Sequence, residues 1–166
     1  IFSPDWYSMY RALELPQEKW AEAERLWLHH YGKQLPVMTA GAGRVLDELG
    51  RAGYTLGVVS SGNRSRVARE IDGLGLDGTF EVLVCDEDVR HKKPHPEGLQ
   101  IAMTQLNKSS EACCYVGDCH EDIEMGKRAG VRTVAVRSGY PNSETVRDAE
   151  PDIFIERIVQ IMEYLK

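Results

Sequence analysis

Apolar and polar positions divide this chain into two zones. Residues 18–31 carry apolar side chains at spacings of three and four, the pattern of a helix with one buried stripe. From residue 37 onward, short apolar runs alternate with longer amphipathic stretches. The expected strands are residues 54–59, 81–85, 112–116, 131–136 and 152–155, and the expected helices are residues 39–52, 64–73, 97–106, 123–129 and 156–165. Strands that alternate with helices are typical of parallel β–α–β units, so the predicted fold class is α/β with a doubly wound parallel sheet.

Composition narrows the class of partner. The 166 residues carry a net charge of −6, which argues against nucleic acid or an anionic membrane as a partner. No apolar run reaches the length of a membrane span, and no signal-peptide pattern is present. The four cysteines lack the spacing of a metal site, so we expect free thiols and a cytoplasmic location.

Two carboxylates follow the expected strand 112–116. Asp118 and Asp122 are four residues apart, at the strand's carboxyl end and at the start of the next helix, so they face the same side. Open α/β sheets build ligand sites at the carboxyl ends of strands. Two hard oxygen ligands suit Mg²⁺. The alternative is that Asp118 caps the helix and Asp122 favours its N-terminal dipole.

A hydroxyl-rich loop follows the expected strand 54–59. Ser60, Ser61 and Gly62 precede the helix that starts near Arg64. A hydroxyl followed by small residues at a helix N-terminus can hold phosphate oxygens with its side chain and its backbone N–H groups. The alternative is an ordinary helix cap formed by Ser or Asn.

A lysine stands in a stiffened loop between these two sites. Lys93 comes directly before Pro94, with Pro96 two residues further on, and proline fixes the backbone φ angle. A lysine held in place can neutralise a transferring phosphoryl group. The alternative is a solvated loop charge, which is usual for lysine.

These three loops occur in a fixed order, and all follow strands of the expected parallel sheet, so we expect them to converge on one edge. The motifs are SSGN at 60–63, KKPHP at 92–96 and VGDCHED at 116–122. In this order they resemble the second, third and fourth motifs of the haloacid dehalogenase-like superfamily. The closest subgroup is that of the phosphoglycolate phosphatase-like enzymes with a helical cap.

The resemblance implies roles for these residues. Ser60, with Ser61 and Gly62, would bind the transferring phosphoryl group, and Lys93 would contact it and stabilise the phospho-intermediate. Asp118 would bind Mg²⁺. Asp122 would support Lys93 or the water shell of the metal, so it counts both as a catalytic and as a metal-site residue.

The first motif of that superfamily, Asp-x-Asp-Gly-Thr, which supplies the nucleophile, is absent from the chain. We expect it upstream of Ile1, with residues 1–35 forming part of the cap and residues 36–166 the α/β core. The alternative is a degenerate motif at Ser3 and Asp5. In the superfamily the strand that bears the first motif is central, so we expect a gap of nearly 10 Å between the strands that end at Val59 and Val116, because neighbouring strands lie about 4.8 Å apart. Residues 1–166 alone should then be unstable and inactive.

The expected function is hydrolysis of a small phosphorylated metabolite, a phosphomonoester, with Mg²⁺ and an aspartyl-phosphate intermediate. Alternatives with the same fold are a sugar-phosphate mutase and a 2-haloacid dehalogenase. The carboxylate pair argues against the dehalogenase, which needs no metal. A third alternative is a non-catalytic binding module that has lost its nucleophile. The sequence leaves the substrate and the oligomeric state open.

Overall fold

The structure is a computed structural model, and it describes residues 6–31, 36–138 and 145–164. Ser3 and Asp5, the alternative first motif, lie outside the described residues. No described helix is long and apolar enough to cross a membrane.

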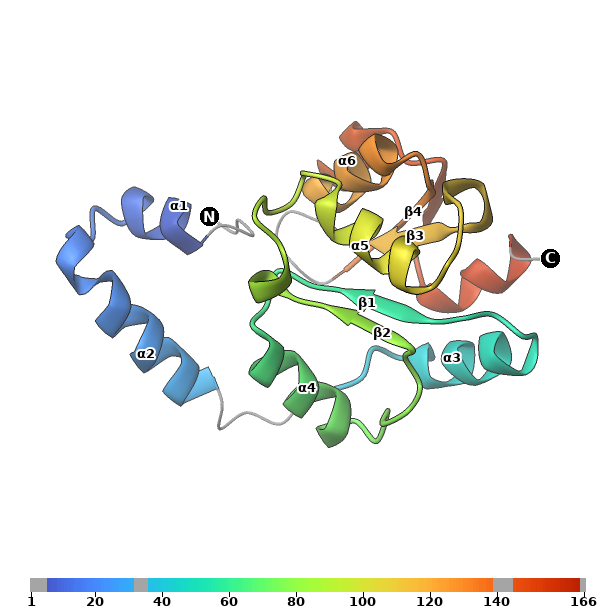
Figure 1. Ribbon diagram of the computed structural model, residues 1–166, viewed down its shortest axis with the longest axis horizontal. Coiled ribbons are helices and arrows are strands. Elements are labelled where there is room, and N and C mark those ends of the chain that lie inside the picture. The colour runs from blue at the N-terminus through green and yellow to red at the C-terminus, as the bar shows by residue number, and fades with distance from the viewer. Residues whose placement is uncertain (1–5, 32–35, 139–144, 165–166) are drawn as a thin grey trace.

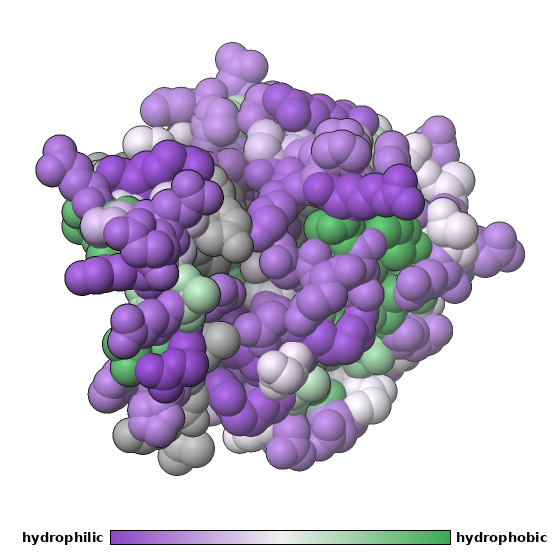
Figure 2. All heavy atoms as spheres, turned by 60° about the vertical axis from the view of Figure 1, so that its left-hand side comes forward, coloured by the Kyte–Doolittle hydropathy of each residue, from purple (hydrophilic) through white to green (hydrophobic). Residues whose placement is uncertain are grey.

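The N-terminal segment forms a helical hairpin to one side of an α/β body (Figure 1). It consists of helix α1 (Trp6–Ala12), the 3₁₀ helix η1 (Gln17–Lys19) and helix α2 (Trp20–Tyr31). The Trp20 indole N–H donates to the carbonyl of Leu15 at 2.9 Å, and its ring lies 5.9 Å from that of Tyr10. Trp20 therefore packs the two helices against each other. The face that carries this hairpin is mostly hydrophilic (Figure 2).

The body alternates strands and helices, as the sequence predicts. Its strands are β1 (Gly57–Val59), β2 (Val82–Val84), β3 (Cys114–Gly117), β4 (Arg132–Val136) and β5 (Ile153–Ile155). Its α-helices are α3 (Ala42–Arg51), α4 (Arg64–Gly73), α5 (Glu97–Gln105) and α6 (His120–Ala129). The 3₁₀ helices are η2 (Asp86–Asp88), η3 (Ser110–Ala112), η4 (Thr145–Ala149) and η5 (Ile158–Glu163).

Several element predictions need correction. Strand β1 begins at Gly57 rather than at residue 54, and helix α3 begins at Ala42 rather than at residue 39. Helix α6 begins at His120 rather than at residue 123, because Asp122 accepts the backbone N–H of Cys119 and so caps the helix earlier. The segment expected as the helix 156–165 is instead the short 3₁₀ helix η5. Its β-branched residues Ile158, Val159 and Ile161 disfavour a regular α-turn.

The described strands form two separate parallel sheets. One sheet pairs β1 with β2, in the register Val58 to Leu83, and the other has the order β3–β4–β5. Within the described part of the chain, no strand pairs with the free edge of β1 or of β3. As predicted, β1 and β3 do not pair with each other in the described residues. The expected separation of nearly 10 Å stays a prediction.

An apolar cavity of about 650 Å³ occupies this gap, and we call it the slot. Its walls come from both sheets and from the helices on either face, and they include Val59, Leu99, Tyr115, Val116 and Ile161. Helices α5 and α6 cover one face of the strands, and α3 and η5 lie against the other (Figure 1). The slot therefore runs between β1 and β3, and residues of α5 line it from one face of the strands and residues of α3 and η5 from the other.

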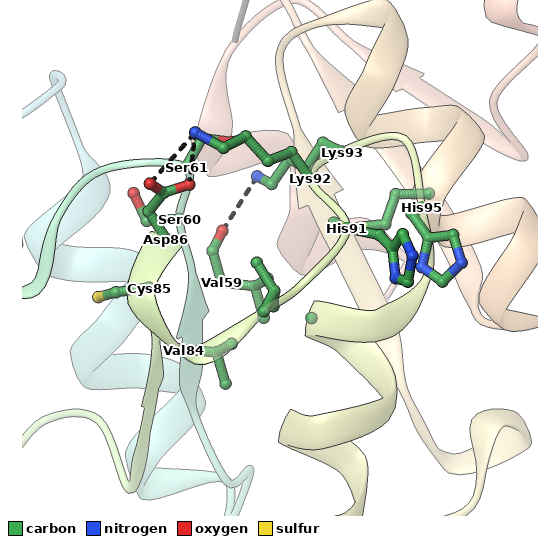
Figure 3. Close-up of a pocket in the computed structure, with 13 residues that line it drawn as sticks. Val59, Ser60, Ser61, Val84, Cys85, Asp86, His91, Lys92, Lys93 and His95 are labelled. Carbon is green, nitrogen blue, oxygen red and sulfur yellow. Dashed lines mark hydrogen bonds and ion pairs between the residues drawn. The ribbon is translucent and has the colours of Figure 1, made fainter. Parts of the chain in front are cut away.

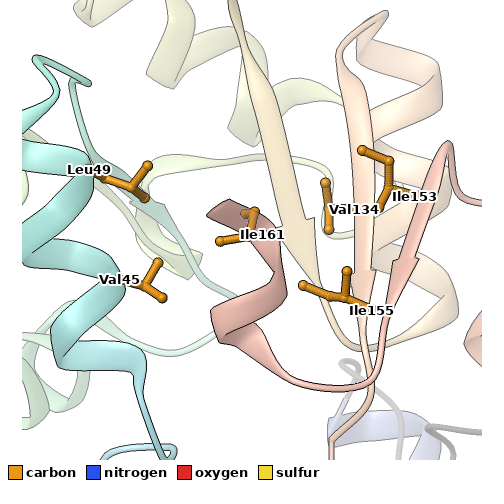
Figure 4. Packing of buried hydrophobic residues seen from close by; sticks show 6 residues of the cluster. All are labelled: Val45, Leu49, Val134, Ile153, Ile155 and Ile161. Atoms are coloured by element: carbon orange, nitrogen blue, oxygen red, sulfur yellow. The ribbon is translucent and has the colours of Figure 1, made fainter. Parts of the chain in front are cut away.

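The main hydrophobic cluster lies on the α3 side of the second sheet (Figure 4). It is formed by Val45 and Leu49 of α3, Val134 of β4, Ile153 and Ile155 of β5, and Ile161 of η5. Ile161 lies between the two residues of α3 and the three residues of the strands (Figure 4). This short 3₁₀ helix thus ties α3 to the sheet.

Candidate functional site

Lys93 lies at the centre of a buried polar cluster. It sits in the loop between β2 and α5, and its side chain is only 13% exposed. Its ammonium donates to the carbonyl of Val59 at 3.0 Å, to the Tyr115 hydroxyl at 2.7 Å and to Asp122 Oδ1 at 2.8 Å. The alternative of a solvated loop charge is therefore wrong.

Asp122 keeps this ammonium charged. Burial by itself would lower the pKa of Lys93, but Tyr115 and the Asp122 carboxylate outweigh it, and the pKa lies above its ordinary value. Burial would raise the pKa of Asp122, but the Lys93 ammonium outweighs that effect and lowers it. The two groups thus form an ion pair at neutral pH.

Both carboxylate oxygens of Asp122 are engaged by the protein. Oδ1 faces Lys93, and Oδ2 accepts the backbone N–H groups of Asp118 at 3.1 Å and of Cys119 at 3.4 Å. A Cβ at Gly117 would come within 2.7 Å of the Asp122 carboxyl carbon, so only glycine fits there. This geometry makes Asp122 the support of Lys93 and of residues 117–122, which we call the acidic loop.

Asp118 lies directly after β3 and is partly buried. The N-cap of α6 is Cys119, so the alternative in which Asp118 caps this helix is wrong. Burial raises the pKa of Asp118, the Asp122 carboxylate adds to the rise, and a hydrogen bond with Ser138 opposes it. Asp118, Cys119 and Asp122 each place one ligand atom within 4.8 Å of the other two. These three residues could together hold a cation, and the Asp122 carboxylate among them is already engaged by Lys93 and by the backbone.

Tyr115 is a member of this cluster that the sequence reasoning missed. Its hydroxyl lies 2.7 Å from the Lys93 ammonium, 3.3 Å from Asp122 Oδ1 and 3.2 Å from the Val59 carbonyl. Burial raises its pKa well above the ordinary value, so the hydroxyl stays protonated. The available signal was a residue with a polar tip in the apolar strand that leads into the acidic loop, since buried tyrosines usually need a hydrogen-bond partner.

The hydroxyl-rich loop, residues 60–62, follows β1, and we call it the serine loop. The backbone N–H of Ser60 donates to the Val84 carbonyl, and the N–H of Gly62 donates to Ser60 Oγ at 3.0 Å. Helix α4 is capped by Asn63, whose side chain accepts the N–H of Arg66 at 2.9 Å. Asn63 is therefore the ordinary cap of this helix. Ser60 and Ser61 lie before it in the loop.

Ser60, Ser61 and Lys93 line one small pocket, together with the loop after β2 (Figure 3). Lys92, the neighbour of Lys93, pairs with Asp86 at 3.0 Å on the serine side of this pocket (Figure 3). The structure thus brings the serine loop to Lys93, and Lys93 to the acidic loop that holds Asp118 and Asp122.

Two residues of this cluster, Val59 and Tyr115, also line the slot. The N–H of Ser60 points to β2, and the carbonyl of the same planar peptide, that of Val59, points the opposite way, into the slot. Lys93 and Tyr115 bind this carbonyl and so link the carboxyl ends of β1 and β3. A strand that filled the slot in parallel would end beside Lys93.

The fold and this arrangement define a class of protein. Residues 2–136 match the haloacid dehalogenase-like hydrolase family, and the chain belongs to it. The sequence is 37% identical over 117 residues to a pyrophosphatase, PpaX, of Oceanobacillus iheyensis, a match that covers 70% of this chain and 55% of that protein.

Solved structures share the fold. A HAD-superfamily hydrolase of subfamily IA from Geobacter sulfurreducens matches with a TM-score of 0.64 and 26% identity, over 78% of this chain and 61% of that one. A predicted phosphoglycolate phosphatase from Haemophilus somnus matches with a TM-score of 0.83 and 19% identity, over 95% of this chain and 72% of that one. The chain thus spans about half the length of the curated relative it matches and is part of a haloacid dehalogenase-like domain.

Proposed function

We propose that this chain forms the greater part of a Mg²⁺-dependent phosphomonoester hydrolase. The observation that supports this most is Lys93, a buried ammonium held by Asp122 between the carboxyl ends of β1 and β3. A buried, paired lysine of this kind is suited to offset the negative charge that gathers during phosphoryl transfer.

The serine loop would bind the phosphoryl group. Ser60 has a hydroxyl in the pocket that Lys93 lines, and the backbone of the loop leads into the N-terminus of α4. N–H groups at a helix N-terminus and a neighbouring hydroxyl attract phosphate oxygens. Lys93 would contact the same phosphoryl group from the other side of the pocket.

The nucleophile would come from a strand in the slot, which lies outside the described residues. The two free edges of β1 and β3 can each pair with one parallel strand, and the slot walls are apolar. A backbone N–H of that strand would replace Lys93 at the carbonyl of Val59. The ammonium would then be free to turn toward an aspartate at the end of the strand, whose carboxylate would attack phosphorus.

The residues present fit a Mg²⁺ ion. Mg²⁺ typically takes one or two protein carboxylates and completes its shell with water and phosphate oxygens. Asp118 would be the direct ligand, because both oxygens of Asp122 already accept hydrogen bonds from the protein. When bound, the ion would offset phosphate charge opposite Lys93.

Phosphate release tests this proposal. It would be measured on the full-length protein, by which we mean a chain that also contains the strand expected in the slot. A panel of small phosphomonoesters and inorganic pyrophosphate would be assayed with Mg²⁺; pyrophosphate is included because one relative is named a pyrophosphatase. We expect hydrolysis of at least one compound, and a loss of about 100-fold or more in Asp118→Asn, in line with the scale of single electrostatic contributions to catalysis. Asp47→Asn, an exposed change on α3, is the control and should retain activity. Release of halide from a 2-haloacid without metal would overturn the proposal.

A further inference from the structure

We propose that His91, His95 and Glu97 form a binding site for a transition-metal ion such as Zn²⁺. Each of the three residues places one ligand atom within 4.8 Å of the other two. Two imidazoles and a carboxylate are a common donor set for Zn²⁺, Co²⁺ and Ni²⁺, whereas Mg²⁺ prefers oxygen ligands alone. These three residues are distinct from the group formed by Asp118, Cys119 and Asp122. The proposal goes beyond the proposed hydrolase activity.

The carboxylate of Glu97 is already fixed in place. Its Oε2 accepts the backbone N–H groups of His91 at 2.9 Å and of Arg90 at 3.2 Å, and it lies 2.9 Å from His91 Nδ1. The site therefore has one anionic ligand whose position the backbone determines.

The two histidines face the same side of the loop (Figure 3). Their ring centroids are 4.4 Å apart, and the backbone N–H of Glu97 donates to His95 Nδ1 at 3.3 Å. A tetrahedral ion with bonds of about 2.1 Å holds its ligand atoms roughly 3.4 Å apart. Because both histidines are exposed, their rings can make the small rotations that this spacing needs.

The two lysines of the loop point away from the histidines. The ammonium groups of Lys92 and Lys93 extend away from the two imidazoles, toward the serine loop (Figure 3). They are paired with Asp86 and Asp122. These two ammonium groups would therefore add little repulsion. Arg128 donates to the neighbouring Pro94 carbonyl at 3.4 Å, and its charge is paired with Glu124 at 2.9 Å. A cation at the histidines would tie together both ends of the loop that positions Lys93.

The test is a metal titration of the full-length protein, without an affinity tag and in excess Mg²⁺. Bound Co²⁺ would be followed by its visible absorption, and bound Zn²⁺ by calorimetry. In the double variant His91→Ala/His95→Ala we expect the loss of one bound ion or a fall in affinity of about tenfold or more. The matched control is His29→Ala/His30→Ala, which removes an adjacent pair of exposed histidines on α2 and should leave binding unchanged.

A further variant separates this site from the acidic loop. Asp118→Asn/Cys119→Ser removes two groups that could themselves hold Zn²⁺. The proposal predicts that the ion lost in the histidine variant is still bound here. If the histidine variant binds metal as the wild type does, or if the ion is lost only in the acidic-loop variant, the proposal is overturned. The variant Glu97→Gln gives a second check, since it should weaken binding while both histidines remain.

Discussion

The Lys93–Asp122 pair shows how a single buried contact can hold a loop, a helix and a strand together. Lys93 belongs to the loop after β2, Asp122 to the start of α6, and their shared partner Tyr115 to β3. Each side chain is less than 15% exposed, at 13% and 8%. A buried ion pair contributes little net stability when intact, but removing one partner leaves the other charge buried without a counter-charge.

Removing Asp122 and removing Lys93 should therefore lower the free energy of unfolding by different amounts. Asp122→Leu leaves a buried ammonium without its counter-charge, which costs about 3–5 kcal/mol. Lys93→Met leaves a carboxylate that still accepts the N–H groups of Asp118 and Cys119, so its cost should be smaller. Urea denaturation of the full-length variants measures both. Equal losses of the free energy of unfolding would show that the backbone donors do not hold Asp122.

Metal affinity should depend on Asp118 more than on Asp122. Asp118 lies at the tip of β3, whereas Asp122 is committed to Lys93 and to the loop backbone. We expect Asp118→Asn to weaken Mg²⁺ binding by about tenfold or more, which is about 1.4 kcal/mol. Titration of Mg²⁺ into the two asparagine variants decides the point. A larger loss of Mg²⁺ affinity in Asp122→Asn would show that Asp122 is the direct ligand and that Asp118 supports it.

At the scale of elements, a carboxylate also joins β4 to β5. Asp152 precedes β5, and its Oδ2 accepts the hydroxyl and the backbone N–H of Thr133, each at 2.7 Å. The Thr133 hydroxyl, and then its N–H, hold the pKa of Asp152 below its ordinary value. The unfolded chain therefore binds this proton more readily than the folded protein does.

This difference should appear as acid sensitivity. The contribution of Asp152 is present above about pH 4, the range of an unperturbed aspartate, and is lost as the pH falls through the lowered value. The free energy of unfolding should thus fall more steeply toward acid in the wild type than in Asp152→Asn. Denaturation of both proteins at a series of pH values tests this. Parallel curves would mean that the Thr133 contacts do not favour the ionised carboxylate.

The elements themselves were largely predictable, because strand and helix periods differ and each apolar run in the body is short. The position of the site could also be predicted, because Ser60, Lys93 and Asp118 lie in loops that follow strands of a parallel sheet. Tyr115 was not predictable in its role, because its position in an apolar strand does not show which loop its hydroxyl meets. The 3₁₀ form of η5 was missed because its apolar spacing also fits an α-helix.

At the scale of the whole molecule, the slot is the dominant feature. It divides the strands into two sheets and leaves the facing edges of β1 and β3 without a strand partner in the described residues. Backbone groups buried without partners cost on the order of 1–3 kcal/mol each. Several such groups would remove most of a net stability that is about 5–15 kcal/mol in ordinary domains. A strand in the slot should therefore govern both stability and activity.

Occupancy of the slot can be followed through a cysteine. Cys114 is a free thiol on β3 that lines the cavity. We expect a thiol reagent to modify it faster in a protein of residues 1–166 than in the full-length protein, where a strand would cover it. Cys85, a fully buried thiol outside the slot, is the internal control once the modified sites are mapped by mass spectrometry. Equal rates at Cys114 in the two proteins would contradict a filled slot.

Phosphate release by residues 1–166 and by the full-length protein, assayed side by side with Mg²⁺, tests the central claim most directly. These residues would supply the serine loop, Lys93 and Asp118, while the slot strand would supply the nucleophile. The full-length protein should hydrolyse a phosphomonoester, and residues 1–166 alone should not. If residues 1–166 release phosphate at a rate that Asp118→Asn abolishes, the proposed need for a strand in the slot is contradicted.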